Sequence, residues 1–402
     1  MISNTETREP LPALYSTLSV LGLILAVLGI AGWVIGLLTN NVAECMRSYL
    51  FGWIFWTNIA LGCFVLSMLA NVVRANWGYP VLRPFEAGSK MLWLMAVLMI
   101  PILIGLKYIY PWMDPVQVAA DPVMQNRHAY MSQTWFIIRA IVYFAIWLIL
   151  STLINQSSIR QDASRDLDEA QWRVNLSAPG IVIYVLTVTF AMTDWLMSLD
   201  SHWFSTIYGF IFCDGQILGA LSLIVLMVMA ARYFNQLPYN DATVSRSSMR
   251  DLGNLMLTFT MVWAYFALSQ WIIIWSGNLT FEGHYYWIRL EDPGLLVMGS
   301  FIVFGQFFFP FLLLLSSRTK RTPLFMAGVA AWILFVRIID IFWMVKPMFL
   351  SHYHLHIPFT PWDVAAFFGI GGLWLFGFVW ALRAHPIFPR HNLSVQEVLE
   401  HA

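Results

Sequence analysis

The chain has 402 residues, of which 59% are hydrophobic, 16% are aromatic and only 11% are charged. Soluble domains carry about 25% charged residues, so the composition excludes an ordinary soluble protein and indicates an all-α integral membrane protein. The formal net charge is zero, which gives no basis for expecting nucleic acid or an acidic partner. The polar, acidic N-terminal segment lacks the basic region of a signal peptide, so we expect no cleavage there.

Apolar segments follow one another along the chain, separated by connections rich in Gly, Pro, Asn and charged residues. A helix needs about 20 apolar residues to cross a bilayer. We predict ten transmembrane helices, at residues 12–39, 47–73, 87–110, 130–156, 176–198, 206–233, 252–275, 294–316, 323–345 and 362–383.

The basic residues are distributed unevenly between the two sets of connections. Of the 22 basic residues, fifteen lie in one set and five in the other, while Arg139 and Arg337 fall inside predicted helices. Basic connections stay in the cytoplasm, and an even number of helices puts both termini on one side. We therefore expect both termini to be cytoplasmic.

The second and sixth predicted helices share a pattern. Residues 50–62 read LFGWIFWTNIALG and residues 207–219 read IYGFIFCDGQILG, and they match at a constant offset of 157 positions. Helices three and seven also match, and the ends of helices five and nine place Asp194 opposite Asp340. Helices four and eight align poorly. The pattern predicts two repeated four-helix bundles, helices 2–5 and 6–9, related as a parallel repeat and flanked by helices 1 and 10.

This repeat suggests a division of the chain into four parts. These are a cytoplasmic tail with helix 1, the first bundle, the second bundle, and an outer loop with helix 10 and a cytoplasmic tail; they correspond to residues 1–46, 47–198, 199–345 and 346–402.

Charged residues inside membrane helices are costly unless they are paired or hydrated, so they mark candidate functional positions. Asp194, Asp214, Arg139, Arg337 and Asp340 all fall in predicted helices, mostly in their outer halves. Arg337 and Asp340 are three positions apart and can pair on one helix face. Asp194 and Asp214 have no basic residue nearby in sequence. We therefore predict that these two acids carry protons, with the arginines as charge partners, and that Asp194→Asn impairs proton coupling or quinol turnover without loss of assembly.

A second charged group lies at the cytoplasmic ends of helices three and seven. Glu86 with Lys90, and Asp251 with Arg250, occupy equivalent places in the two repeats. Acids in the first turn of a helix also suit its dipole. Polar side chains deeper in the helices could connect the inner and outer groups through water; they are Gln216, Ser269, Gln270 and Gln306. Glutamine more often cross-links membrane helices.

The residues that hold redox cofactors or metals are not arranged as such sites require. All nine histidines lie in connections or at helix ends, and the three cysteines show no iron–sulfur or haem-attachment spacing. The HYHLH segment at 352–356 has no nearby carboxylate or cysteine, so we expect a contact segment rather than a metal site. We therefore expect no metal and no cofactor bound by this chain.

The segment TDWLMSLDSHWFSTIYG at 193–209, followed by LGALSLIVLMVMAARYF at 218–234, resembles the NrfD/PsrC-type membrane subunits. Within that group it is similar to the ActF-type subunit, the smaller of the two NrfD-like subunits of bacterial alternative complex III. The resemblance covers nearly the whole chain, and one departure is Ser201, where proline is expected.

This resemblance implies a membrane subunit of a quinol:cytochrome c oxidoreductase, or of one with another periplasmic acceptor, in the bacterial inner membrane. The implied partners are a second NrfD-like membrane subunit, an iron–sulfur subunit and c-type cytochrome subunits. Haem c and iron–sulfur clusters would lie in those partners. Quinol is a possible ligand here, either in a pocket-like polar interior or beside a proton path.

Two other functions remain open at this stage. A secondary transporter or proton channel acting alone would also have a repeat and charges at membrane depth. Against it, no pair of Gly/Pro-interrupted helices stands at matching positions in the two repeats. The other is a scaffold without chemistry that holds haem and iron–sulfur subunits at the membrane.

Overall fold

A computed structural model describes residues 11–39, 41–74, 76–164, 167–349 and 359–389. In the first half the helices are α1 (Ala13–Leu38), α2 (Val42–Val73), η1 (Asn76–Gly78), α3 (Leu82–Lys90), α4 (Leu92–Val97), α5 (Ile100–Ile104), α6 (Leu106–Ile109), η2 (Pro111–Met113), α7 (Pro115–Ala120), α8 (Pro122–Arg127), α9 (Gln133–Ser164) and α10 (Leu167–Trp195). In the second half they are η3 (Met197–Leu199), α11 (Tyr208–Tyr233), α12 (Arg246–Gly277), α13 (Thr280–Glu291), α14 (Pro293–Ile302), η4 (Val303–Phe308), α15 (Phe309–Leu315), α16 (Ser317–Lys320), α17 (Pro323–Val345), η5 (Lys346–Phe349) and α18 (Pro361–Arg383).

The described residues form helices and connections, with no strand among them. Ten helical spans are long and apolar enough to cross a membrane, which confirms the predicted all-α membrane protein with ten transmembrane helices. Two spans are interrupted. The third runs through α3, α4 and α5, with Pro101 near its end, and the eighth contains the π-helix η4 between α14 and α15. Proline lacks the N–H that continues a helix, and π-turns insert an extra residue.

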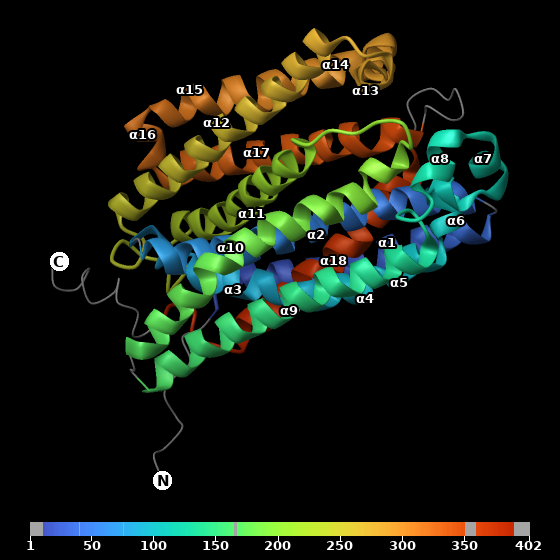
Figure 1. Cartoon of the computed structure of the whole chain (residues 1–402). Helices are drawn as coiled ribbons and strands as arrows, with labels where there is room; N and C mark the ends of the chain where they lie inside the picture. Colours follow the sequence, from blue (N-terminus) through green and yellow to red (C-terminus); the bar gives the residue numbers. More distant parts are fainter. Residues whose placement is uncertain (1–10, 40, 75, 165–166, 350–358, 390–402) are drawn as a thin grey trace.

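The long helices run side by side and pack as two groups of four (Figure 1). In the first group α2 contacts α3 and α10, and α9 contacts α3, α4 and α10. In the second, α11 contacts α12 and α17, and α15 contacts α12 and α17. We name these groups the first bundle and the second bundle. They join where α11 packs against α2 and α10. The boundaries predicted for the four parts of the chain stay a prediction.

The contact between α2 and α11 has the symmetry that a repeat predicts. A Cβ added to Gly62 would clash with the backbone of Gln216, and a Cβ added to Gly219 would lie 3.2 Å from Cδ1 of Ile59. At the sequence offset of 157, Gly62 corresponds to Gly219 and Ile59 corresponds to Gln216. Each helix therefore offers a glycine to the same place on the other, as in a two-fold interface.

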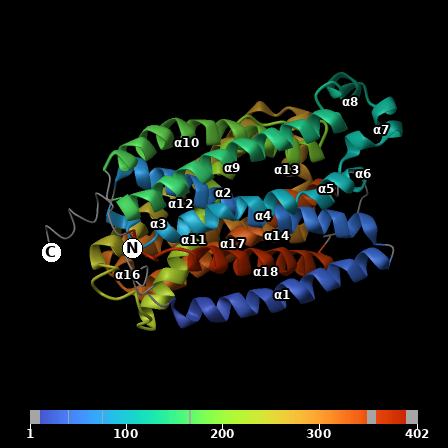
Figure 2. The same cartoon turned by 90° about the horizontal axis from the view of Figure 1, so that it is seen from below.

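The first and last spans, α1 and α18, lie against each other at one edge of the molecule (Figure 2). Glycines let their backbones meet. A Cβ at Gly22 would lie 3.0 Å from the carbonyl oxygen of Gly372, and one at Gly369 would lie 3.0 Å from the carbonyl carbon of Gly29. Small residues permit this close approach in membrane helices.

The ten spans leave two ends of the molecule. We name the end that carries α7, α8 and α13 the loop end, and the end where α1 begins and α18 ends the terminal end (Figure 1). In the predicted orientation, the loop end faces outward.

Candidate functional site

The carboxylate of Asp194 lies near the end of α10 and is fully paired. Arg139 of α9 donates from Nε to Oδ2 (2.7 Å) and from Nη2 to Oδ1 (2.9 Å), which is the bidentate geometry of strong Arg–carboxylate pairs. The Tyr143 hydroxyl adds a third hydrogen bond of 2.8 Å. Arg139 is itself held by the ring of Tyr130, at 3.8 Å, and by that residue's carbonyl. Asp194 therefore ties α10 to α9.

Asp214 of α11 has a different environment. It is buried, with 3% of its surface exposed, and neither carboxylate oxygen has a hydrogen-bond partner among the described residues. The cation closest to it comes from α17. The guanidinium carbon of Arg337 lies 2.7 Å from where a Cβ of Gly215 would stand, so that side chain packs against the backbone beside Asp214.

Arg337 forms its direct ion pair with Asp340, on the same helix face. Both side chains are buried. In the second bundle one guanidinium thus stands close to two acids, of which only Asp340 is hydrogen-bonded to it. Asp194 and Asp214 lie on contacting helices, as predicted, but Asp194 is held by the first bundle and Asp214 faces the second.

Near the loop end of the second bundle, α13 packs beside this group. Arg289 is buried and donates to the carbonyl oxygens of Trp343 and Met344, at 3.2 and 3.1 Å, and its guanidinium lies over the ring of Tyr285. Burial raises the pKa of the Tyr285 hydroxyl; Arg289 opposes this shift and the Asp340 charge adds to it. The charge of Asp340 thus acts on a residue of α13.

Glu86, predicted to belong to a charged group on the cytoplasmic side, forms an ion pair, but its partner is Arg83 rather than Lys90. Arg83 donates to Glu86 at 2.5 Å and also pairs with Asp162 of α9. The pairing predicted with Lys90 is absent from the described ion pairs, because the arginine, three positions before Glu86, reaches both acids with its two amino groups. One Glu86 oxygen remains without a hydrogen-bond partner.

From Glu86 a row of small polar side chains leads into the first bundle. Ser89 donates to the Glu86 carbonyl at 2.8 Å, and Ser151 and Asn155 of α9 each donate to the Ser89 hydroxyl at 3.0 Å. All are buried. Asp251, the predicted counterpart of Glu86, instead lies partly exposed and pairs with Arg250 at 3.3 Å.

A polar cluster that the sequence did not predict as a unit lies where the two bundles meet. The Tyr184 hydroxyl of α10 donates to Oε1 of Gln216 (2.5 Å), and Nε2 of Gln216 donates to Oδ1 of Asn58 on α2 (2.9 Å). Gln216 was the one member predicted. Asn58 could have been recognised because it interrupts an apolar run, whereas nothing in the sequence distinguishes Tyr184.

The second bundle holds further buried polar atoms without partners in the described chain. They belong to the hydroxyl of Thr260 and the amide of Gln306. Gln306 lies in the π-helix η4 and is completely buried. Of the other predicted linking residues, Gln270 bonds to Ser205 and Tyr286 near the loop end.

The HYHLH segment at 352–356 lies outside the described residues. Within the described ranges, no group of three or more His, Cys, Asp or Glu side chains could hold a metal ion. The three cysteines are buried and form no disulfide.

The chain was compared with known proteins. It matches no protein-family model and no curated protein.

Proposed function

We propose that this chain is a membrane subunit of a quinol-oxidising complex that reduces cytochrome c or another periplasmic acceptor. In this proposal it binds no redox cofactor and contributes a protonatable interior centred on Asp214. Haem c and iron–sulfur clusters belong to the partner subunits, together with a second NrfD-like membrane subunit. The chain lies in a bacterial inner membrane with both termini in the cytoplasm. The sequence resemblance at residues 193–209 supports the family.

The observation that carries the proton role is the state of Asp214. An acid at membrane depth costs about 3 kcal/mol even on insertion scales, and burying an ionised group without hydrogen bonds costs more. Asp214 has no donor among the described residues, and Arg337 beside it is already bound to Asp340. Its charge is therefore weakly compensated, which favours a group that gains and loses a proton.

The same reasoning makes Asp194 a weaker candidate for proton transfer than Asp214. Three hydrogen bonds, two of them from Arg139, stabilise its charged form. An ion pair of this kind holds α9 and α10 together and is a poor proton carrier. The sequence favoured both acids equally, and the contacts favour Asp214.

Oxidation of a quinol to a quinone releases two protons and two electrons. In the proposed complex the electrons pass to the partner subunits, and a buried carboxylate can accept a proton from a neighbouring water or polar group. The Tyr184–Gln216–Asn58 cluster and the row from Glu86 to Ser151 lie on the terminal-end side of Asp214. They are the polar groups along which protons would travel.

The experiment compares Asp214→Asn with wild type in the complex isolated from its own membranes and reconstituted into liposomes. We expect the rate of proton movement to fall at least tenfold, because a positioned proton-transfer group typically contributes about 10²–10⁴-fold to rate. Subunit content and thermal stability should remain at or above the wild-type level, because the substitution removes a buried charge. Unchanged proton movement in this variant would refute the proposed role of Asp214.

A scaffold without chemistry is the second candidate, and one observation favours it. Asp194, Asp340, Glu86 and Asp251 are all ion-paired, as expected of residues that only tie helices together. The scaffold predicts full proton movement in Asp214→Asn, so the same experiment separates the two.

A transporter acting alone receives less support. Its discontinuous helices should stand at matching positions in the two repeats. The interrupted spans here are the third and the eighth, whereas the predicted repeat pairs the third with the seventh, α12, which is one uninterrupted helix. Purification in mild detergent followed by mass spectrometry would show whether partner subunits accompany the chain.

A further inference from the structure

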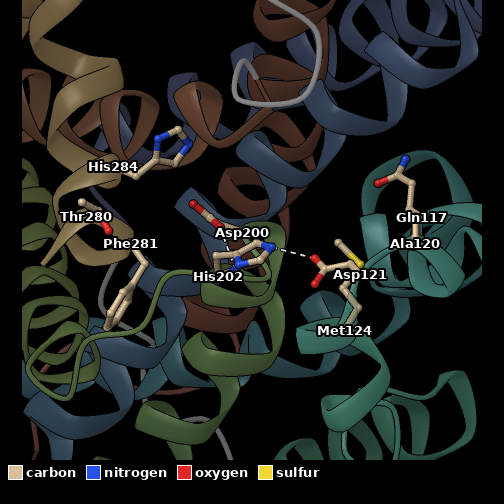
Figure 3. A pocket seen from close by; sticks show the side chains of 9 residues that line it. All are labelled: Gln117, Ala120, Asp121, Met124, Asp200, His202, Thr280, Phe281 and His284. Carbon is tan, nitrogen blue, oxygen red and sulfur yellow. Dashed lines mark hydrogen bonds and ion pairs between the residues drawn. The ribbon is translucent and has the colours of Figure 1, made fainter.

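A hollow of about 600 Å³ opens at the loop end, outside the membrane spans. Its walls come from both halves of the chain: α7 and α8 on one side, the turn at residues 200–202 in the middle, and α13 on the other (Figure 3). Its volume is within the range of sites that bind a small group or an inserted side chain.

Asp200 forms the centre of this hollow. The residue is buried, with 4% of its surface exposed. Its Oδ1 accepts the backbone N–H groups of His202 (3.0 Å) and Trp203 (3.2 Å), which fix the carboxylate in place. No hydrogen bond from the described residues reaches its Oδ2, and this oxygen is not fully enclosed. One oxygen of a rigidly held, buried carboxylate is thus left for a donor that the described chain does not supply.

A second carboxylate lies across the hollow. Oδ2 of Asp121 is 2.6 Å from Nε2 of His202, and Oδ1 accepts the backbone N–H of Val123 at 2.9 Å. Partial burial raises the pKa of Asp121, but the hydrogen bonds from Val123 and His202 outweigh it, so the pKa lies below its ordinary value. Asp121 therefore remains ionised, and two negative carboxylates favour a cation as the occupant.

The remaining walls suit a cation carried on an apolar stem. Phe281 of α13 and Met124 of α8 line the hollow beside the carboxylates, and Figure 3 shows them toward opposite ends of the row formed by Asp200, His202 and Asp121. Lysine and arginine bury their methylene stems against such surfaces while the charged head reaches polar groups. A bare metal ion fits less well, because the described residues offer no group of three or more suitable ligands.

Lysine fits better than arginine. The guanidinium group of arginine binds best to both oxygens of one carboxylate at once. Oδ1 of Asp200 is already occupied by two backbone donors. An ammonium group is a compact charge that needs only one carboxylate oxygen, so it can bind Oδ2 of Asp200 while the charge of Asp121 adds to the attraction.

We propose that this hollow is a docking site for a lysine side chain of a partner protein that binds the loop end of the chain from outside the membrane. The site is separate from Asp214 and does not depend on its role in proton movement. A lysine bound in this hollow would fix the position of an extramembrane partner protein relative to the loop end.

The test is zero-length cross-linking with a water-soluble carbodiimide, which joins a carboxylate to a lysine amine in contact with it. Native membranes are treated, the chain is isolated and digested, and cross-linked peptides are identified by mass spectrometry. We expect peptides that join residue 121 or 200 to a lysine of another protein. Asp121→Asn and Asp200→Asn should each reduce the cross-link at their own position at least tenfold.

Both asparagine variants keep an oxygen that can accept the same backbone N–H groups, so folding is preserved. Asp114→Asn is the matched control, because Asp114 caps α7 at the same end without lining the hollow. It should leave both cross-links at their wild-type yield. Wild-type membranes that give cross-links from residues 121 and 200 only to this chain's own lysines, or none at all, would overturn the proposal. Loss of proton movement in Asp214→Asn with these cross-links intact would show that the two sites fail independently.

Discussion

The first and second bundles contain acids at equivalent positions but compensate them differently. Asp194 and Asp340 correspond in the repeat. Asp194 takes Arg139 from a neighbouring helix, whereas Asp340 takes Arg337 from its own. The residue equivalent to Asp214 in the first bundle is Thr57, which carries no charge. Around these positions, one acid pairs with one arginine in the first bundle, whereas Asp340 and Asp214 stand beside the same arginine in the second.

This difference shows how a repeated fold can separate stability from chemistry. A balanced pair is a fixed connection between helices. An unbalanced group changes its charge with small changes in its surroundings, because a single cation cannot satisfy both acids. The variants below test whether the two bundles differ in this way.

The largest effect is expected from Arg337→Met. It leaves Asp340 and Asp214 buried without their cation, and breaking a buried pair costs about 3–5 kcal/mol. Thermal unfolding in detergent should show a large loss of stability. Adding Asp340→Asn should restore much of it, because the double variant removes the stranded charge. A single variant as stable as wild type would show that Arg337 does not compensate these acids.

A smaller loss is expected from Asp194→Asn in the first bundle. Arg139 is left without its partner, but 18% of its side-chain surface is exposed, so water can hydrate it in part. We expect a loss of about 2 kcal/mol, below the range for fully buried pairs. Tyr143→Phe, which removes only the third hydrogen bond, should cost about 1.5 kcal/mol. If proton movement in liposomes falls in Asp194→Asn as far as in Asp214→Asn, the contrast between the bundles is wrong.

The contact between the bundles gives a matched pair of substitutions. Gly62→Ala places a methyl group against the Gln216 backbone, which cannot move aside, and should cost about 1–3 kcal/mol. Gly219→Ala meets only the flexible end of Ile59, at 3.2 Å, and should be nearly neutral. Equal losses in unfolding measurements would mean that the two glycines are equivalent in packing as well as in sequence.

The smallest effect concerns pH and Asp121. Because its pKa is lowered in the folded protein, its contribution to stability is present above the unfolded value of about 3.9 and is lost as the pH falls through the folded value. The difference in unfolding midpoint between wild type and Asp121→Asn should be constant above about pH 5 and shrink below about pH 4. A difference that grows on acidification would contradict the sign of this shift.

Much of the fold could be predicted from the sequence because hydrophobic length is a direct physical requirement of the bilayer. The ten spans follow from it. The offset of 157 positions also pairs Gly62 with Gly219, the two glycines that lie at the contact between α2 and α11. Interruptions were harder to see. Pro310 lies just after the π-helix in the eighth span, but a proline does not by itself specify a π-turn.

The sequence predicted most residues of the candidate site but not which of them form ion pairs and hydrogen bonds with one another. Charge in an apolar run identifies Asp194, Asp214 and Arg139, since such residues are rare at membrane depth. Which acid an arginine binds depends on helix rotation and on distances between helices far apart in sequence. The selection of Arg83 over Lys90 by Glu86, and the inclusion of Tyr184 beside Gln216, come from that packing.

The glycine contact between α1 and α18 joins segments that are synthesised far apart in time. Gly29 and Gly369 touch, although 340 positions separate them in the sequence. At ribosomal rates of roughly 5–20 residues per second, the first helix waits about 17–70 s in the membrane before its partner exists. Until then its glycine-lined face is open to lipid or to other helices. A chain that stops before α18 never closes this contact, so the pairing of α1 with α18 reports that synthesis has passed both segments.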